Sequence, residues 1–199
     1  MRKLVFWSVF CVVAIAAPLT VAVAAEDDLS GFTLKQLNVA INSSGVAEKK
    51  LYSILTFDSE ERAGANIAVL SGARSGWQVT VLHRVTGGLK VEWSSGKLSD
   101  DFAVSSSSQL QIEDVGDEQV VEFFGCARHQ CGYLESVSGL LLYSPLSKQV
   151  FFAHYSYEEG KPLDSFGSLK FSKNASEPGN ERYKAALQKA MSTKLHYKI

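Results

Sequence analysis

Two cysteines and a histidine lie close together in the segment Cys126-Ala127-Arg128-His129-Gln130-Cys131. Such a group supports two chemistries: the thiols can join in a disulfide that closes a small loop, or two thiolates and an imidazole can bind a metal ion. Structural zinc sites combine ligand pairs that are spaced more widely, and no fourth ligand is evident in the sequence around this segment. We therefore expect a disulfide here, and no metal or cofactor.

A disulfide between Cys126 and Cys131 would contribute roughly 2 kcal/mol to stability by the loop-entropy relation, which is too little to explain the fold. Its larger effect is to remove backbone freedom before any partner binds, so the side chains of the loop are presented at little further entropic cost. We expect Arg128, His129 and Gln130 to form a binding loop. The alternative is that the disulfide only staples a turn and His129 points into solvent.

Carboxylates are frequent in the sequence around this segment, where Arg128 is the only Lys or Arg between positions 113 and 135. An acidic surround would attract a cationic partner; the alternative is that these carboxylates are the solvated face of a strand. Three of them stand close enough to raise the further alternative of a calcium loop. The residues concerned are Glu113, Asp114, Asp117, Glu118, Glu122 and Glu135, with Asp114, Asp117 and Glu118 as the candidate calcium ligands.

The elements that position this loop are predicted to be mostly β-strands. Apolar, β-branched and aromatic residues gather in runs that are punctuated by turn residues such as Gly87-Gly88. Short links favour antiparallel pairing over βαβ units, which need long crossovers. The predicted strands cover residues 50–57, 66–70, 77–85, 89–93, 109–112, 119–124, 140–143, 150–157 and 168–171.

Helices are expected at two places. Asn180 is a candidate cap for a helix over residues 181–194, in which Tyr183, Leu187, Ala190 and Met191 make one apolar stripe. A shorter helix is expected over residues 34–41. The predicted fold class is therefore α+β: a single domain built on an antiparallel β-sheet, with a C-terminal helix packed on it and the cysteine loop projecting from one corner.

The first 25 residues have the composition of a secretory signal peptide. Arg2 and Lys3 precede an apolar run that ends in small residues before Glu26, the order typical of a cleaved signal. The alternative is a membrane anchor, against which Pro18 and the small-residue end argue. We expect residues 1–25 to be removed and residues 26–199 to act as one exported domain in the periplasm or outside the cell.

Export has consequences for the chemistry of the mature chain. Cys11 leaves with the signal, so Cys126 and Cys131 remain as the only cysteine pair in an oxidising compartment. No later apolar run is long enough to span a bilayer, so no membrane insertion is expected after cleavage. The chain has 20 Lys and Arg against 21 Asp and Glu, which predicts no nucleic-acid partner.

The cysteine loop resembles the diagnostic loop of the periplasmic inhibitors of vertebrate-type lysozyme, a short disulfide-closed segment that reads C-K-P-H-D-C. Cys126, His129 and Cys131 match it in register, while Ala127, Arg128 and Gln130 replace its Lys, Pro and Asp. In that family the loop projects from an α+β domain into the lysozyme cleft, and its His engages the catalytic carboxylates. The resemblance therefore implies this role for His129, with a cationic protein such as lysozyme as the partner.

Two other classes of function remain open. The sequence has no G-x-S-x-G, H-E-x-x-H or phosphate-loop motif, and its histidines, at positions 83, 129, 154 and 196, are scattered. We therefore expect a binding or inhibitor protein and not an enzyme. The alternatives are an exported accessory or structural domain without an active site, and a secreted hydrolase whose site only the fold assembles.

Asn42 and Asn174 begin N-glycosylation acceptor patterns, which matter only in a eukaryotic host.

Overall fold

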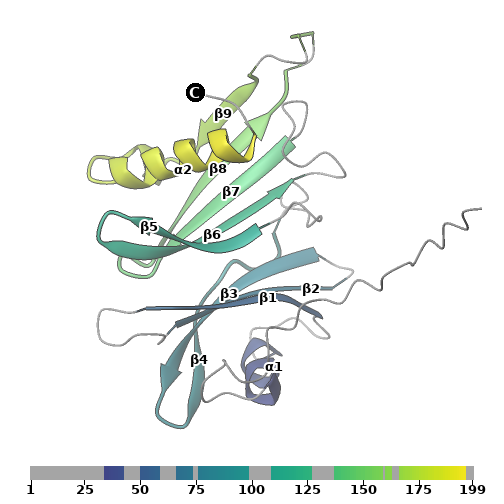
Figure 1. The fold of residues 1–199 in the computed structure, drawn as a ribbon, viewed down its shortest axis with the longest axis vertical. Coiled ribbons are helices and arrows are strands. Elements are labelled where there is room, and N and C mark those ends of the chain that lie inside the picture. The colour runs from purple at the N-terminus through teal and green to yellow at the C-terminus, as the bar shows by residue number, and fades with distance from the viewer. Residues whose placement is uncertain are drawn as a thin grey trace, which may run out of the picture. The chain divides into compact units, whose positions relative to one another are not determined.

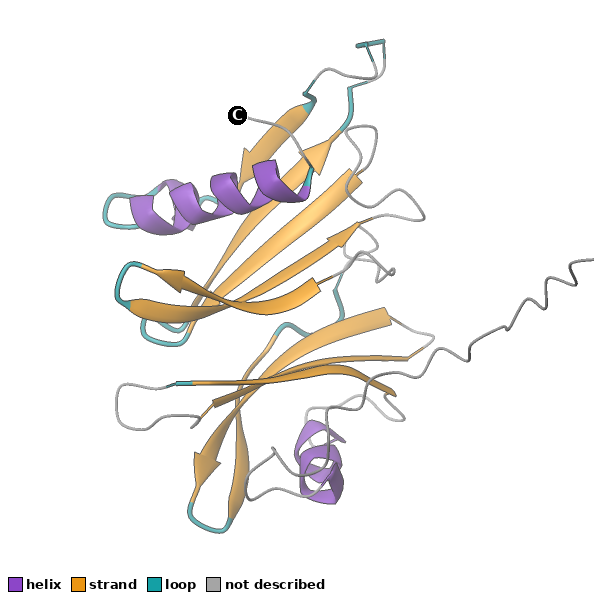
Figure 2. Cartoon of the chain, in the orientation of Figure 1, coloured by secondary structure: helices purple, strands orange, loops and turns teal. Residues whose placement is uncertain are grey.

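The computed structural model describes residues 34–42, 50–58, 66–73, 76–98, 109–126, 137–158, 160–162 and 166–195. The predicted signal peptide lies outside these ranges. Within them, two antiparallel sheets and two α-helices confirm the predicted α+β class (Figure 1, Figure 2). Neither of the described helices is long and apolar enough to cross a membrane.

The first sheet has the strand order β1-β2-β3-β4. Its strands are β1 (Lys50–Phe57), β2 (Asn66–Ala73), β3 (Gly76–Val85) and β4 (Gly88–Ser94), and α1 (Leu34–Asn42) precedes them. Leu37 and Ile41 of α1 pack with Ile67, Val69 and Leu82 on one face of this sheet. Gly87 has a φ of 90° in the turn between β3 and β4, which is the conformation that a glycine at this turn was expected to supply.

The second sheet has the order β5-β6-β7-β8-β9. Its strands are β5 (Gln109–Val115), β6 (Glu118–Cys126), β7 (Val137–Ser144), β8 (Gln149–Ser156) and β9 (Ser168–Phe171), and the 3-10 helix η2 (Asn174–Ser176) and α2 (Glu181–Lys194) follow them. Strand β5 continues three residues past its predicted end, because Val115 pairs with Glu118 around a turn whose Gly116 has a φ of 71°. The acidic segment is therefore a β-hairpin.

Helix α2 covers one face of the five-stranded sheet. Tyr183, Leu187 and Met191 are buried there, and Ala190 packs beside them, so the predicted apolar stripe is confirmed.

The prediction of Asn180 as the cap of this helix is right in its position and wrong in its hydrogen bond. Asn180 occupies the N-cap position, but its side chain makes no capping bond to the helix and donates instead to the Asn174 carbonyl. A hydrogen bond from its own backbone N–H lowers the pKa of Glu181, and so does a second bond, of 2.9 Å, that the carboxylate accepts from the N–H of Gly179.

A shared apolar cluster joins the faces of the two sheets. Val79 and Val81 of β3 pack in one cluster with Val121, Phe123 and Leu141 of β6 and β7. Trp93 of β4 stacks on Tyr143 of β7 with ring centroids 4.5 Å apart. The sequence predicts strands and their antiparallel pairing, but it does not predict that the strands divide into two sheets between β4 and β5.

Candidate functional site

The predicted binding loop begins at the end of β6. Cys126 is the last residue of that strand, is fully buried, and pairs with Ser138 of the neighbouring strand β7. The loop therefore belongs to the connection between two antiparallel neighbours, as its prediction at a hairpin-like corner requires. Arg128, His129, Gln130 and Cys131 lie outside the described residues, so the disulfide and the roles of these side chains stay predictions.

The described base of this connection is anchored on all sides. Strands β6 and β7 each pair with a neighbour on both edges. Phe123 and Phe124 lie in apolar clusters on opposite faces of the sheet, as do Leu141 and Leu140. A connection that leaves such strands starts from backbone positions fixed by both hydrogen bonding and packing.

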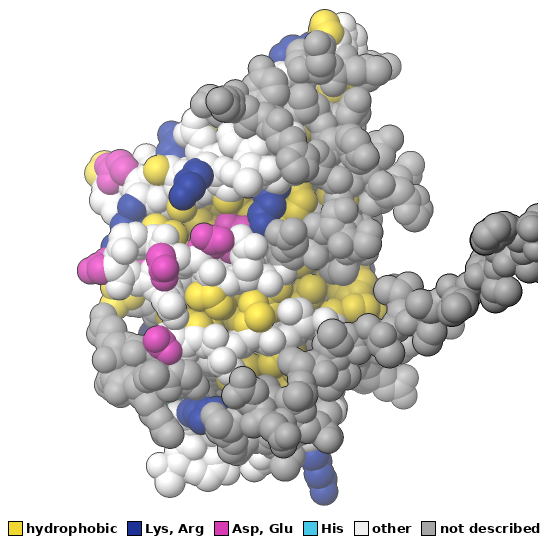
Figure 3. All heavy atoms as spheres, in the orientation of Figure 1, with side chains coloured by type: hydrophobic (Ala, Val, Ile, Leu, Met, Phe, Trp, Pro, Cys, Tyr) yellow, Lys and Arg dark blue, Asp and Glu magenta, His cyan; other side chains and the backbone are white. Residues whose placement is uncertain are grey.

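Asp117 and Glu118 are two of the described carboxylates that flank the loop in sequence. Asp117 and Glu118 lie at the opposite end of β6 from Cys126, roughly 25 Å away at about 3.3 Å per residue. On the face drawn in Figure 3, acidic and basic side chains are interleaved over α2 and the β5–β6 hairpin. Asp117 and Glu118 therefore lie far from Cys126, where the loop begins, because the two ends of an extended strand are far apart.

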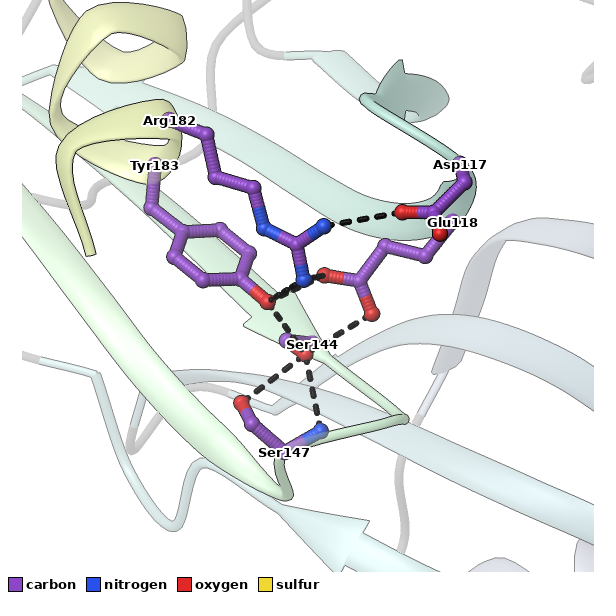
Figure 4. Close-up of polar contacts among 6 residues, drawn as sticks. All are labelled: Asp117, Glu118, Ser144, Ser147, Arg182 and Tyr183. Atoms are coloured by element: carbon purple, nitrogen blue, oxygen red, sulfur yellow. Dashed lines mark hydrogen bonds and ion pairs between the residues drawn. The ribbon is translucent and has the colours of Figure 1, made fainter. Parts of the chain in front are cut away.

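A polar network ties the first turn of α2 to two turns of the sheet (Figure 4). Arg182 donates to Asp117 across 2.9 Å and to the Tyr183 hydroxyl across 2.8 Å. Tyr183 in turn donates to Glu118 in a short contact. Ser144, from the end of β7, donates to the other oxygen of Glu118 across 3.0 Å. The neighbouring Ser147 donates to Ser144 through both its backbone N–H and its hydroxyl.

This network has the properties of a structural brace. The side chain of Glu118 is 8% exposed, and it has three kinds of donor: a phenol, a guanidinium and a hydroxyl. Buried polar groups with partners of this kind stabilise one arrangement of the chain. Asp117 and Glu118 are engaged by Arg182, and no group of three or more His, Cys, Asp or Glu in the described ranges could hold a metal ion. The carboxylates of Asp117 and Glu118 are therefore directed at the Arg182 guanidinium.

A second buried carboxylate, Glu122, lies on the same face of β6 beneath the end of α2. Its side chain is 2% exposed and forms an ion pair of 3.4 Å with Lys194. Gln111 of β5 bridges the pair: its amide N–H donates to Glu122 across 2.8 Å, and its amide oxygen accepts from Lys194 across 3.1 Å. Burial raises the pKa of Glu122 to about 7, although Lys194 acts in the opposite direction.

The sequence predicts Glu122 only as one of the carboxylates around the loop, and not as a buried residue. A signal was present, because Glu122 alternates with Val120 and Phe124 in a strand where those two residues belong to the core under α2. A carboxylate in phase with core residues is expected to be buried and to need a partner. Lys194, its partner, is 72 positions further along the chain, so spacing gave no indication of the pair.

The two described histidines lie in different sheets. His83 lies on β3, where its Nδ1 is 2.8 Å from the side-chain oxygen of Asn66. His154 lies on β8, in the other sheet, opposite Gly139. Asn174 begins one of the two N-glycosylation patterns. Its side-chain nitrogen donates to the Val150 carbonyl across 2.9 Å, so this amide holds two parts of the fold together.

Comparison of the chain with protein-family models, curated proteins and solved structures finds no match.

Proposed function

We propose that this chain is an exported binding protein that presents the β6–β7 connection, with Arg128, His129 and Gln130, to a partner protein. The observation that carries the proposal is the anchoring of the connection at Cys126 and Ser138, two fully buried residues of neighbouring strands. A rigid base lowers the ordering cost of binding, as does a disulfide that closes the loop. The sequence of the loop places an imidazole and a guanidinium between the two cysteines.

The partner that this chemistry fits best is a lysozyme. An imidazole N–H donates well to a carboxylate, and a pair of carboxylates cleaves the substrate in this class of enzyme. The resemblance of the Cys126–Cys131 segment to the loop of lysozyme inhibitors supports the same partner. The carboxylates of Asp117 and Glu118 do not support a cationic partner such as lysozyme, because they are paired with Arg182.

The test is a cell-wall turbidity assay of the purified protein, expressed from the full chain, against several lysozyme classes. We expect dose-dependent protection of the cell walls by the wild type and loss of that protection in His129→Ala, with an unchanged melting temperature. The matched control is His83→Gln, on a different strand, which should keep the inhibition. Wild-type protein that protects against no lysozyme class would refute the inhibitor proposal.

One observation favours a second candidate, an accessory domain without an active site. The carboxylates of Glu118 and Glu122 both make internal contacts, chiefly with α2, and so hold the fold together. An accessory domain predicts that no interaction depends on His129. Retained binding of a co-purifying partner by His129→Ala would favour this candidate.

A further inference from the structure

The two ends of α2 are attached to the sheet by different chemistry. At the start of the helix, Glu118 receives three kinds of donor, and Arg182 has a further carboxylate partner in the 88% exposed Asp117. At the end of the helix, Glu122 receives donors only from Lys194 and Gln111 among the contacts of the described residues. The end of the helix thus depends on a buried carboxylate with fewer donors.

The surroundings of Glu122 offer little else to compensate its charge. Lys194 is the cation that α2 supplies, and its side chain is 13% exposed. Strand β5 supplies the neutral Gln111 and the acidic Glu113, whose carboxylate also accepts from Gln111 across 2.6 Å. Strand β7 supplies the apolar Leu142 as the cross-strand neighbour. One cation therefore faces two carboxylates, of which only Glu122 is buried.

We propose that the last turn of α2, which ends at Lys194, is a pH-sensitive latch that closes over Glu122 in acid and opens more readily as the pH rises toward neutrality. Closing the turn removes the Glu122 carboxyl from water, and opening it returns the carboxyl to water. Burial of this group costs much less free energy when it carries a proton than when it is ionised. Loss of the proton therefore favours the open helix end.

The sign and the pH window follow from proton linkage. Below about pH 4.5, its ordinary pKa, Glu122 is protonated in both states, and closing has its full advantage. That advantage is lost as the pH rises through about 7, the raised pKa of the buried group, and does not change further above it. By this linkage the ratio of open to closed helix ends should rise on the order of tenfold between pH 6 and pH 8.

The test is amide hydrogen exchange of the protein expressed from the full chain, followed by NMR from pH 5 to pH 9. Protection factors divide out the intrinsic effect of pH on exchange. We expect the N–H of Leu195, which bonds to the Met191 carbonyl, to lose about tenfold in protection between pH 6 and pH 8 and to level off above that. It should exchange faster than the N–H of Leu141 in β7 throughout, because the opening is local.

Three variants separate the latch from other causes. Glu122→Gln keeps an acceptor oxygen and cannot ionise, so the pH dependence at Leu195 should vanish. Glu113→Gln, the matched control, removes an exposed carboxylate that contacts the same Gln111, and should keep the dependence with a slightly lower midpoint. Lys194→Met removes the compensating cation and should move the midpoint to higher pH.

Several results would overturn the latch. The first is a protection factor of the Leu195 N–H that does not change with pH in the wild type. The second and third are an undiminished pH dependence in Glu122→Gln and an unmoved midpoint in Lys194→Met. The fourth is equal protection of Leu195 and Leu141, which would mean global unfolding. The wild-type profile is decisive even if Glu122→Gln does not fold.

Discussion

Glu118 and Glu122 show how the surroundings of one residue type decide its behaviour. Both belong to β6, and both face α2. Glu118 is surrounded by donors, whereas Glu122 has a raised pKa because desolvation outweighs the charge of Lys194. A buried carboxylate with few donors makes the local structure sensitive to pH.

Tyr183→Phe tests the brace at the scale of one hydroxyl. Loss of the Tyr183 hydroxyl removes one donor to Glu118 and one acceptor for Arg182, and both of these residues keep other partners. We expect a loss of about 1–2 kcal/mol in the free energy of unfolding, measured by urea denaturation. The control is Tyr157→Phe, whose exposed hydroxyl donates to the Lys161 carbonyl and should contribute almost nothing. Equal effects of the two changes would contradict the brace.

At the scale of elements, the first sheet depends on a close approach between β2 and β3. Gly72 and Trp77 are cross-strand partners, and the indole ring lies directly over the glycine. A Cβ at position 72 would come within 2.3 Å of the ring, closer than packed atoms can be. The glycine is therefore required by packing and not by a turn.

Gly72→Ala should consequently destabilise the protein by roughly 2–3 kcal/mol, because Trp77 has to leave its position. Urea denaturation measures the loss, and a shift in tryptophan emission reports the displaced ring. Gly88→Ala is the matched control: it also lies in this sheet, and a Cβ there meets nothing within 4 Å. If Gly72→Ala were as stable as Gly88→Ala, the close approach would be disproved.

At the scale of the whole described structure, the stacked pair Trp93–Tyr143 joins the two sheets. It belongs to the apolar cluster that contains strands of both sheets, and the backbone N–H of Asp58 donates to Gln119 across 2.9 Å as a further link between them. Contacts of this kind make the sheets unfold together.

A double-mutant cycle measures this link. The double mutant of Trp93→Leu and Tyr143→Leu should lose about 1 kcal/mol less free energy of unfolding than the sum of the two single losses, because each single change already removes the stacking. Trp93→Leu combined with Phe151→Leu is the control, because Phe151 lies in the cluster under α2, and these two effects should add. Full additivity of the first pair would show that the stacking does not couple the sheets.

The sequence by itself determined most of the local structure. All nine predicted strands and both predicted helices are present in the structure, with small differences at their ends. Side-chain alternation, turn glycines and the apolar stripe of α2 act over a few neighbouring residues, so they can be recognised from a short window. The same window identified the cysteine loop as a connection between two strands.

Only the tertiary structure decided which strands share a sheet, which carboxylates are buried and which cations they meet. Glu118 meets Arg182 and Glu122 meets Lys194 because α2 packs across β6, and each pair joins residues that are more than 60 positions apart. It also places Glu118 and Cys126 at opposite ends of β6. Local patterns carry no information on such contacts, because burial and the pKa values that follow from it depend on neighbours brought together by the whole chain.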